Sequence, residues 1–85
     1  MDADTLRSKI EAGIPGAQVE AQDTHGTGDH FEVTVVAEHF EGKNLVARHR
    51  LVYEALGDAM KSEIHALMIR TLTPEQYQGG LMKID

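Results

Sequence analysis

The stretch HFEVTVVAEHFEGKNLVARHRLVYEAL, residues 30–56, holds the clearest secondary-structure signals in the chain. Within it, residues 31–36 alternate apolar and polar positions and are rich in β-branched side chains, which predicts a strand. Residues 38–44 follow as a turn. From residue 45 to residue 60 apolar side chains then recur with a period near 3.6, which predicts a helix of about four turns with one apolar stripe.

The sequence before this stretch predicts a helix and a strand. Residues 4–13 carry apolar side chains at helical spacing, with Asp4 or Thr5 as alternative N-caps. Residues 17–23 alternate as a short strand, and the glycine-rich loop that follows brings this strand close enough to the next to form an antiparallel hairpin.

After the long helix, residues 64–71 predict a third strand. Thr73 and Pro74 then predict an N-cap and the first position of a short final helix. The order is therefore α-β-β-α-β-α, and the crossover through the long helix makes the second and third strands parallel if they are neighbours. We expect one α/β domain over residues 1–78, a three-stranded mixed sheet with helices on one face, and a flexible tail over residues 79–85.

Composition limits the classes of function. The chain has 85 residues, 14 acidic against 8 basic side chains and no cysteine. It therefore supplies no thiolate to a metal and no thiol nucleophile, and its net charge of −6 disfavours non-specific adhesion to nucleic acid or anionic membranes. No apolar run approaches a membrane span and no secretory signal is visible, so we expect a cytoplasmic protein, or an organellar one after removal of a targeting segment.

Motifs of catalysis are absent from the sequence. It contains no phosphate-binding P-loop, no His-Glu-x-x-His pair and no nucleophile elbow. Neither of its serines stands beside a plausible base in the sequence. We therefore expect a protein without enzymatic activity.

Several short motifs occur together in an order typical of one family. They are Phe-Glu-Gly-Lys at 40–43, Arg-His-Arg at 48–50 and Ile-His-Ala-Leu at 64–67. In this arrangement the chain resembles the BolA family over roughly residues 30–77. The resemblance implies a fold like the class II KH module, with a helix-turn-helix-like element at residues 38–60.

The resemblance also implies a partner and a cargo. Members of the family associate with monothiol glutaredoxins, either as an apo pair or around a shared [2Fe–2S] cluster. In the holo complex the glutaredoxin cysteine and a glutathione supply thiolates, and the BolA-like protein supplies histidine. We accordingly expect no cofactor on the isolated chain, which would be a monomer or a weak homodimer.

The resemblance and the topology together select candidate metal ligands. The family's ligand histidine corresponds to His65, and a second, more variable ligand belongs to the loop before the second strand. That loop contains His25 and ends at His30. If the second and third strands are parallel, their N-terminal ends share one edge of the sheet, so these side chains converge. His25 is the preferred second ligand and His30 the alternative.

The remaining histidines and a basic group have other interpretations. His49 lies on the apolar stripe of the long helix and is expected to pack in the core or an interface, whereas His39 is expected to be exposed. Lys43, Arg48 and Arg50 form a local positive group. It suits the carboxylates of a glutaredoxin–glutathione surface or, as the second hypothesis, DNA phosphates contacted by a transcriptional regulator.

Overall fold

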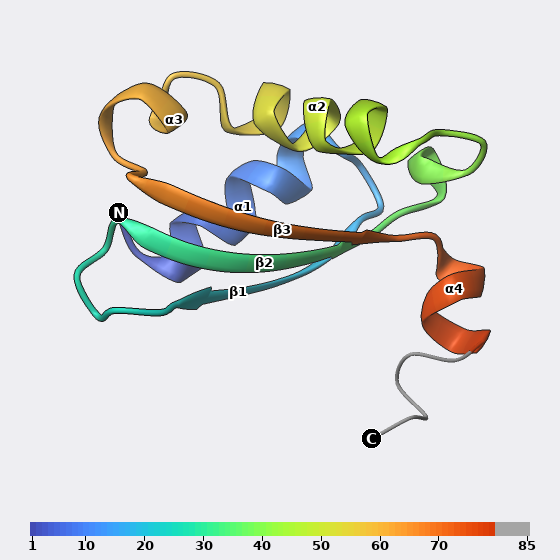
Figure 1. Cartoon of the computed structure of the whole chain (residues 1–85), viewed down its shortest axis with the longest axis horizontal. Helices are drawn as coiled ribbons and strands as arrows, with labels where there is room; N and C mark the ends of the chain where they lie inside the picture. The colour runs from blue at the N-terminus through green and yellow to red at the C-terminus, as the bar shows by residue number, and fades with distance from the viewer. Residues whose placement is uncertain (80–85) are drawn as a thin grey trace.

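A three-stranded sheet forms the centre of the structure, a computed structural model that describes residues 1–79 (Figure 1). The strands are β1 (Gln18–Asp23), β2 (His30–Val36) and β3 (Ala66–Leu72), in the order β1-β2-β3. β1 and β2 are antiparallel and β2 and β3 are parallel. The predicted hairpin and parallel crossover are both confirmed.

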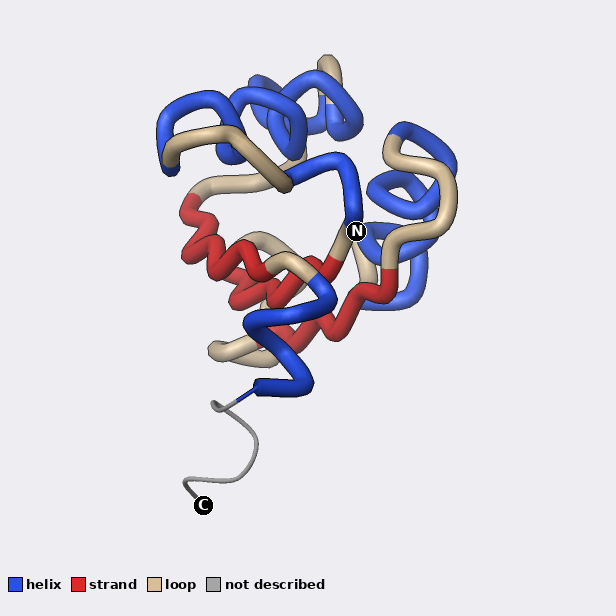
Figure 2. Tube along the Cα trace, turned by 90° about the vertical axis from the view of Figure 1, so that its right-hand side faces the viewer, coloured by secondary structure: helices blue, strands red, loops and turns tan. Residues whose placement is uncertain are grey.

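The helices follow the predicted order, with two short additions. They are α1 (Ala3–Gly13), the 3-10 helix η1 (Glu38–Phe40), α2 (Leu45–Leu56), α3 (Ala59–Ser62) and α4 (Pro74–Gly79). Figure 2 shows α1 and α2 over one face of the sheet, whereas α4 projects on the other side beyond the end of β3. A small α/β domain with a mixed sheet results, as the sequence predicted.

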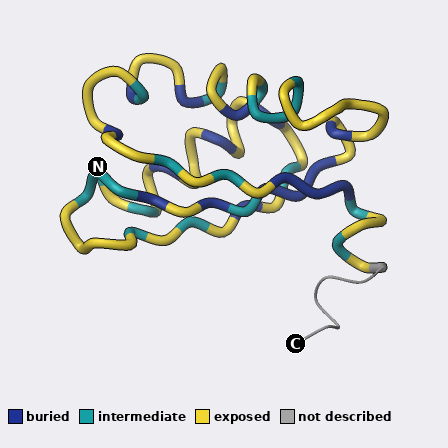
Figure 3. Tube along the Cα trace, in the orientation of Figure 1, coloured by how far each residue is buried: buried dark blue, intermediate teal, exposed yellow. Residues whose placement is uncertain are grey.

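The core lies between the sheet and the helix layer (Figure 3). In β2, Phe31, Val33 and Val35 are buried and alternate with more exposed positions, because successive side chains of a strand point to opposite faces. The helices contribute apolar side chains from one face each. The buried core residues that come from the helices and the segments next to them are Leu6, Ile10, Ile14, Val52, Leu56, Ala59 and Ile64.

The prediction of one helix from residue 45 to residue 60 was wrong. Gly57 ends α2 with φ 56°, a backbone conformation that residues with a Cβ rarely adopt. The short helix α3 begins two residues later. The predicted stripe is also only partly internal. Val52 and Leu56 are buried, but Leu45 and Val46 at the start of α2 are exposed. In this first turn the half-buried residues are instead 47–49.

The caps of two helices show where sequence reasoning failed and where it held. α1 is capped by Asp2, whose carboxylate accepts a hydrogen bond from the Thr5 backbone N–H at 2.8 Å, so neither Asp4 nor Thr5 is its N-cap. At α4 the prediction is confirmed. Thr73 Oγ1 accepts from the Gln76 backbone N–H (3.1 Å), while Gln76 Oε1 accepts from the Thr73 backbone N–H (2.9 Å), which is a reciprocal capping box.

The contact between α1 and α2 requires a residue without a side chain. A Cβ added at Gly13 would lie 2.4 Å from Ala55 Cβ and 2.8 Å from Ala55 Cα. Because the nearest atoms include backbone, the two helices could not keep this spacing with a larger residue at position 13. Gly13 therefore allows the close approach of α1 to α2, in addition to standing at the C-terminal end of α1.

Replacement of Asn44 by alanine should destabilise the domain by about 1 kcal/mol. Asn44 is the N-cap of α2, and its side-chain oxygen accepts a hydrogen bond from the Ala47 backbone N–H at 2.9 Å. Urea unfolding measures the difference. Asn44→Asp keeps the acceptor and should stay close to the wild type; equal losses in both variants would contradict the assignment.

The end of the chain is described only in part. α4 reaches Gly79, and residues 80–85, which make up nearly all of the predicted flexible tail, lie outside the described residues. Across residues 1–79, no helix has both the length and the apolar character required to span a membrane.

Candidate functional site

Three histidines lie together where β2 and β3 begin. The ring centres of His25 and His30 are 4.3 Å apart in an edge-on arrangement, and those of His30 and His65 are 5.1 Å apart with tilted rings. His30 is the first residue of β2, and His65 directly precedes β3. The parallel pairing of His30 with Ala66 brings together two segments that are far apart in the sequence.

The loop that carries His25 is held by the carboxylate of Asp23. Asp23 Oδ1 accepts from the backbone N–H groups of His25 (3.3 Å) and Gly26 (2.8 Å), and Oδ2 accepts from that of Gly28 (2.8 Å). The Thr24 N–H donates to the His30 carbonyl oxygen across the loop (2.9 Å). These bonds fix the path of a loop that the glycines alone would leave flexible.

Asp29 connects the other two histidines. Its carboxylate accepts hydrogen bonds from the Thr27 hydroxyl and from His30 Nδ1, the latter at 2.8 Å. Its backbone carbonyl accepts from the N–H groups of His65 (2.7 Å) and Ala66 (3.1 Å). The bond from Thr27 and then that from His30 lower the pKa of the Asp29 carboxyl below its usual value, so it is ionised at neutral pH.

The third strand begins later than the sequence indicated. β3 spans Ala66–Leu72, because the Ile64 N–H donates to the Ala59 carbonyl of α3 and is not part of the sheet. His65 is exposed, whereas as a strand residue it would share a face with Leu67 and Ile69, which are half-buried. Its imidazole is therefore accessible at the edge of the domain.

The donor set of this site is exposed and incomplete. His25 and His65 are exposed, and His30 keeps 30% of its side-chain surface accessible. Within residues 1–79 no group of three or more His, Asp or Glu side chains is arranged to hold a metal ion. The chain also has no cysteine. Adjacent imidazoles at an accessible edge fit a role as part of a coordination sphere whose other ligands another molecule supplies.

Sequence reasoning identified the three histidines but not the residues that position them. Asp23 and Asp29 flank the glycine-containing loop, and an acidic residue at each end of such a loop was the available signal. Of the other histidines, His39 is exposed as predicted, and His49 is half-buried on α2.

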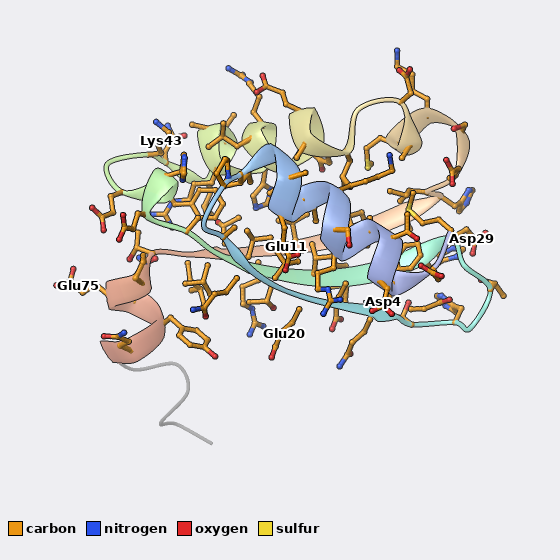
Figure 4. All side chains as sticks on the ribbon, turned by 180° about the vertical axis from the view of Figure 1, so that it is seen from behind. Asp4, Glu11, Glu20, Asp29, Lys43 and Glu75 are labelled. Atoms are coloured by element: carbon orange, nitrogen blue, oxygen red, sulfur yellow. The ribbon has the colours of Figure 1, made fainter. Side chains whose placement is uncertain are left out.

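The basic residues lie far from the histidines. Figure 4 shows Lys43 and Asp29 at opposite ends of the molecule. Lys43 and Arg50 are exposed, but Arg48 makes internal contacts: its Nε donates to the Lys43 carbonyl (2.9 Å) and its Nη1 to Gln76 Oε1 (3.1 Å). Its guanidinium also lies over the Phe40 ring, 5.8 Å from the ring centre. Arg48 thus links α2 to α4.

Replacement of Asp23 by asparagine should loosen the histidine loop selectively. The remaining amide oxygen can accept from Gly26, whereas the N–H of Gly28 loses its acceptor. Hydrogen exchange at Gly28 should then quicken by about tenfold, as for the loss of one hydrogen bond of ordinary net strength. Asp23→Ala should raise exchange at both glycines. Unchanged exchange in both variants would show that the carboxylate does not hold the loop.

Comparison with known proteins is consistent with this fold and sequence pattern. The model of the BolA-like protein family matches residues 7–76. BolA-like protein 2 from Mus musculus is 43% identical over 79 residues, which are 91% of each chain. The chain belongs to the BolA-like protein family.

Two further relatives extend the comparison. The solved structure of a bolA protein homologue from Coxiella burnetii has a TM-score of 0.81 at 42% identity, covering 92% of this chain and 97% of that one. The DNA-binding transcriptional regulator BolA of Vibrio cholerae is 51% identical over 53 residues, which are 62% of this chain and 50% of that protein.

Proposed function

We propose that this protein is an adaptor that pairs with a monothiol glutaredoxin and contributes histidine to a shared [2Fe–2S] cluster. The cluster is the cargo of the pair. The partner's cysteine and a glutathione supply the thiolates that this chain lacks. A cytoplasmic or organellar location is equally compatible with this role.

The adjacency of His30 and His65 carries the proposal. The imidazoles of His30, the first residue of β2, and of His65, just before β3, have ring centres 5.1 Å apart at an accessible edge, and the chain has no cysteine to complete a site. Neutral imidazole is a common iron ligand, and replacing thiolate by histidine makes a cluster less negative and raises its reduction potential. Two histidines cannot complete the coordination of a metal in the isolated chain, but they can serve as ligands of a cluster that bridges two proteins.

Reconstitution tests the proposal directly. The protein, a monothiol glutaredoxin, glutathione, ferrous iron and sulfide are mixed anaerobically, and the products are separated by size with absorbance recorded. We expect a heterodimer whose visible circular dichroism differs from that of the glutaredoxin homodimer with its cluster. The protein alone, treated identically, should remain colourless. A glutaredoxin that elutes separately in both its apo and its reconstituted form would refute the proposal.

DNA binding is the second candidate. It is supported by the likeness to the DNA-binding transcriptional regulator BolA of Vibrio cholerae and by two exposed basic residues, Lys43 before α2 and Arg50 within it. Arg48 is less available because it bonds internally. Binding of a duplex fragment should then weaken steeply with salt, and Arg50→Ala should reduce the salt slope by about one. Absence of measurable binding at low salt would eliminate this candidate.

A further inference from the structure

We propose that Asp29 is a positioning residue, which presents the Nε2 atom of His30 next to His65 and so makes His30 the companion of His65 in the site. This inference rests on the proposed function for the identity of the metal. It concerns a residue that neither the motifs nor the candidate ligands include, and it can be tested in the isolated protein.

The hydrogen bonds determine which nitrogen of His30 is free. An ionised carboxylate only accepts hydrogen bonds, so the 2.8 Å contact between Asp29 Oδ1 and His30 Nδ1 places the imidazole hydrogen on Nδ1. Nε2 is then the unprotonated nitrogen. An imidazole that donates its second nitrogen to a carboxylate is held in one tautomer and orientation and becomes a more basic metal ligand.

Asp29 also fixes the position of His65. Its backbone carbonyl accepts the N–H of His65 at 2.7 Å, while its side chain holds His30. One residue therefore sets the separation of two histidines that are far apart in the sequence, one at the start of β2 and one just before β3. The Thr27 hydroxyl, which also donates to Asp29 Oδ1, restrains the carboxylate itself.

The spacing favours the pair of His30 and His65. Two imidazoles that bind one tetrahedral ion through bonds of about 2 Å place their ring centres about 5 Å apart. The observed separation is 5.1 Å for His30 and His65. His25 lies against the His30 ring, 4.3 Å from it and edge-on, which is the contact of a packed neighbour.

His25 has a weaker constraint than His30. Its Nδ1 lies 3.2 Å from the Thr24 hydroxyl, whose hydrogen is donated to the His30 carbonyl oxygen. The contact of His25 is exposed and neutral, whereas the bond from His30 is partly buried and is made to a charged group. Charge-assisted hydrogen bonds are roughly twice as strong as neutral ones. His30 is therefore the better oriented of the two candidate second ligands.

Imidazole nitrogen NMR of the isolated protein tests the first half of the proposal. At about pH 8, long-range proton–nitrogen spectra should show His30 as the Nδ1–H tautomer. Asp29→Ala should shift it toward a mixture, whereas Asp29→Asn keeps an accepting oxygen and should restore the tautomer. Glu11→Ala, an exposed carboxylate on α1, serves as the matched control. An Nε2–H tautomer in the wild type would overturn the proposal.

Cluster lifetime in the glutaredoxin complex tests the second half. Asp29→Ala should shorten the lifetime by about tenfold and His30→Ala by about 100-fold, the double variant should be no worse than His30→Ala alone, and His25→Ala should change it less than twofold. The pairing of His30 with His65 would be overturned if His30→Ala left the cluster lifetime unchanged while His25→Ala shortened it severely. Failure of the wild type to form any complex would refute the proposed function instead, and the NMR result would still decide the role of Asp29.

Discussion

Replacement of His65 by alanine is expected to abolish stable retention of the cluster in the complex with glutaredoxin, with loss at least about 100-fold faster than in the wild type. Changes to residues that merely orient a metal ligand cost about 10- to 100-fold, and removal of a ligand should reach or exceed the upper end of that range. The decay of visible circular dichroism after addition of a chelator measures the rate.

The fold should survive this substitution. The His65 side chain is exposed, and the bond to Asp29 uses its backbone N–H, which alanine retains. His39→Ala is the matched control, because His39 is also exposed but lies beyond the opposite end of β2. Association of the apo proteins, followed separately by calorimetry, should change little in both variants. A His65→Ala complex that keeps its cluster as long as the wild type would exclude His65 as a ligand.

Replacement of Phe40 by alanine should have the largest effect on stability, a loss of about 3–5 kcal/mol. Phe40 is fully buried in η1, and the Arg48 guanidinium lies over its ring. The variant loses the transfer free energy of the ring, leaves a cavity and removes one of the contacts that hold Arg48 between α2 and α4. A domain of this size has a total stability of roughly 4–13 kcal/mol, so this loss is a large part of the total and the variant should unfold at a markedly lower temperature than the wild type.

Urea unfolding at low temperature makes this prediction measurable. Phe40→Leu retains most of the buried apolar volume and should lose less than about 1.5 kcal/mol. Tyr77→Ala, which removes a half-buried aromatic side chain from the surface of α4, tests whether loss of any ring has the same effect. Equal destabilisation by Phe40→Ala and Phe40→Leu would show that the site is insensitive to cavity formation.

Local sequence signals were sufficient for most of the secondary structure. Period-2 alternation in residues 31–36 and period-3.6 spacing in residues 4–13 reflect the two repeats of backbone geometry, so they predicted β2 and α1. The long-helix prediction failed at Gly57 because apolar spacing continues through it to Met60. A period records which side chains are apolar, but it does not record a break in the backbone.

The caps and close approaches depended on information that the pattern does not hold. Asp2, Asp4 and Thr5 are all acceptable N-caps by residue type, and only the path of the chain selects Asp2. Similarly, Gly13 can be interpreted as a helix terminator, but its contact with Ala55 arises from the crossing of α1 and α2. Contacts between segments distant in sequence are set by packing of the whole domain.

The candidate site divides in the same way. By itself the sequence determined the family, the order of elements and the three histidines, because motifs and strand order are local or nearly local properties. It also determined, through the absence of cysteine, that any thiolate must come from another molecule. Only the tertiary structure decided that His30 stands between His25 and His65, and that Asp29 holds two of the three. These contacts join residues 23–30 to residue 65, and they form only when β3 pairs beside β2.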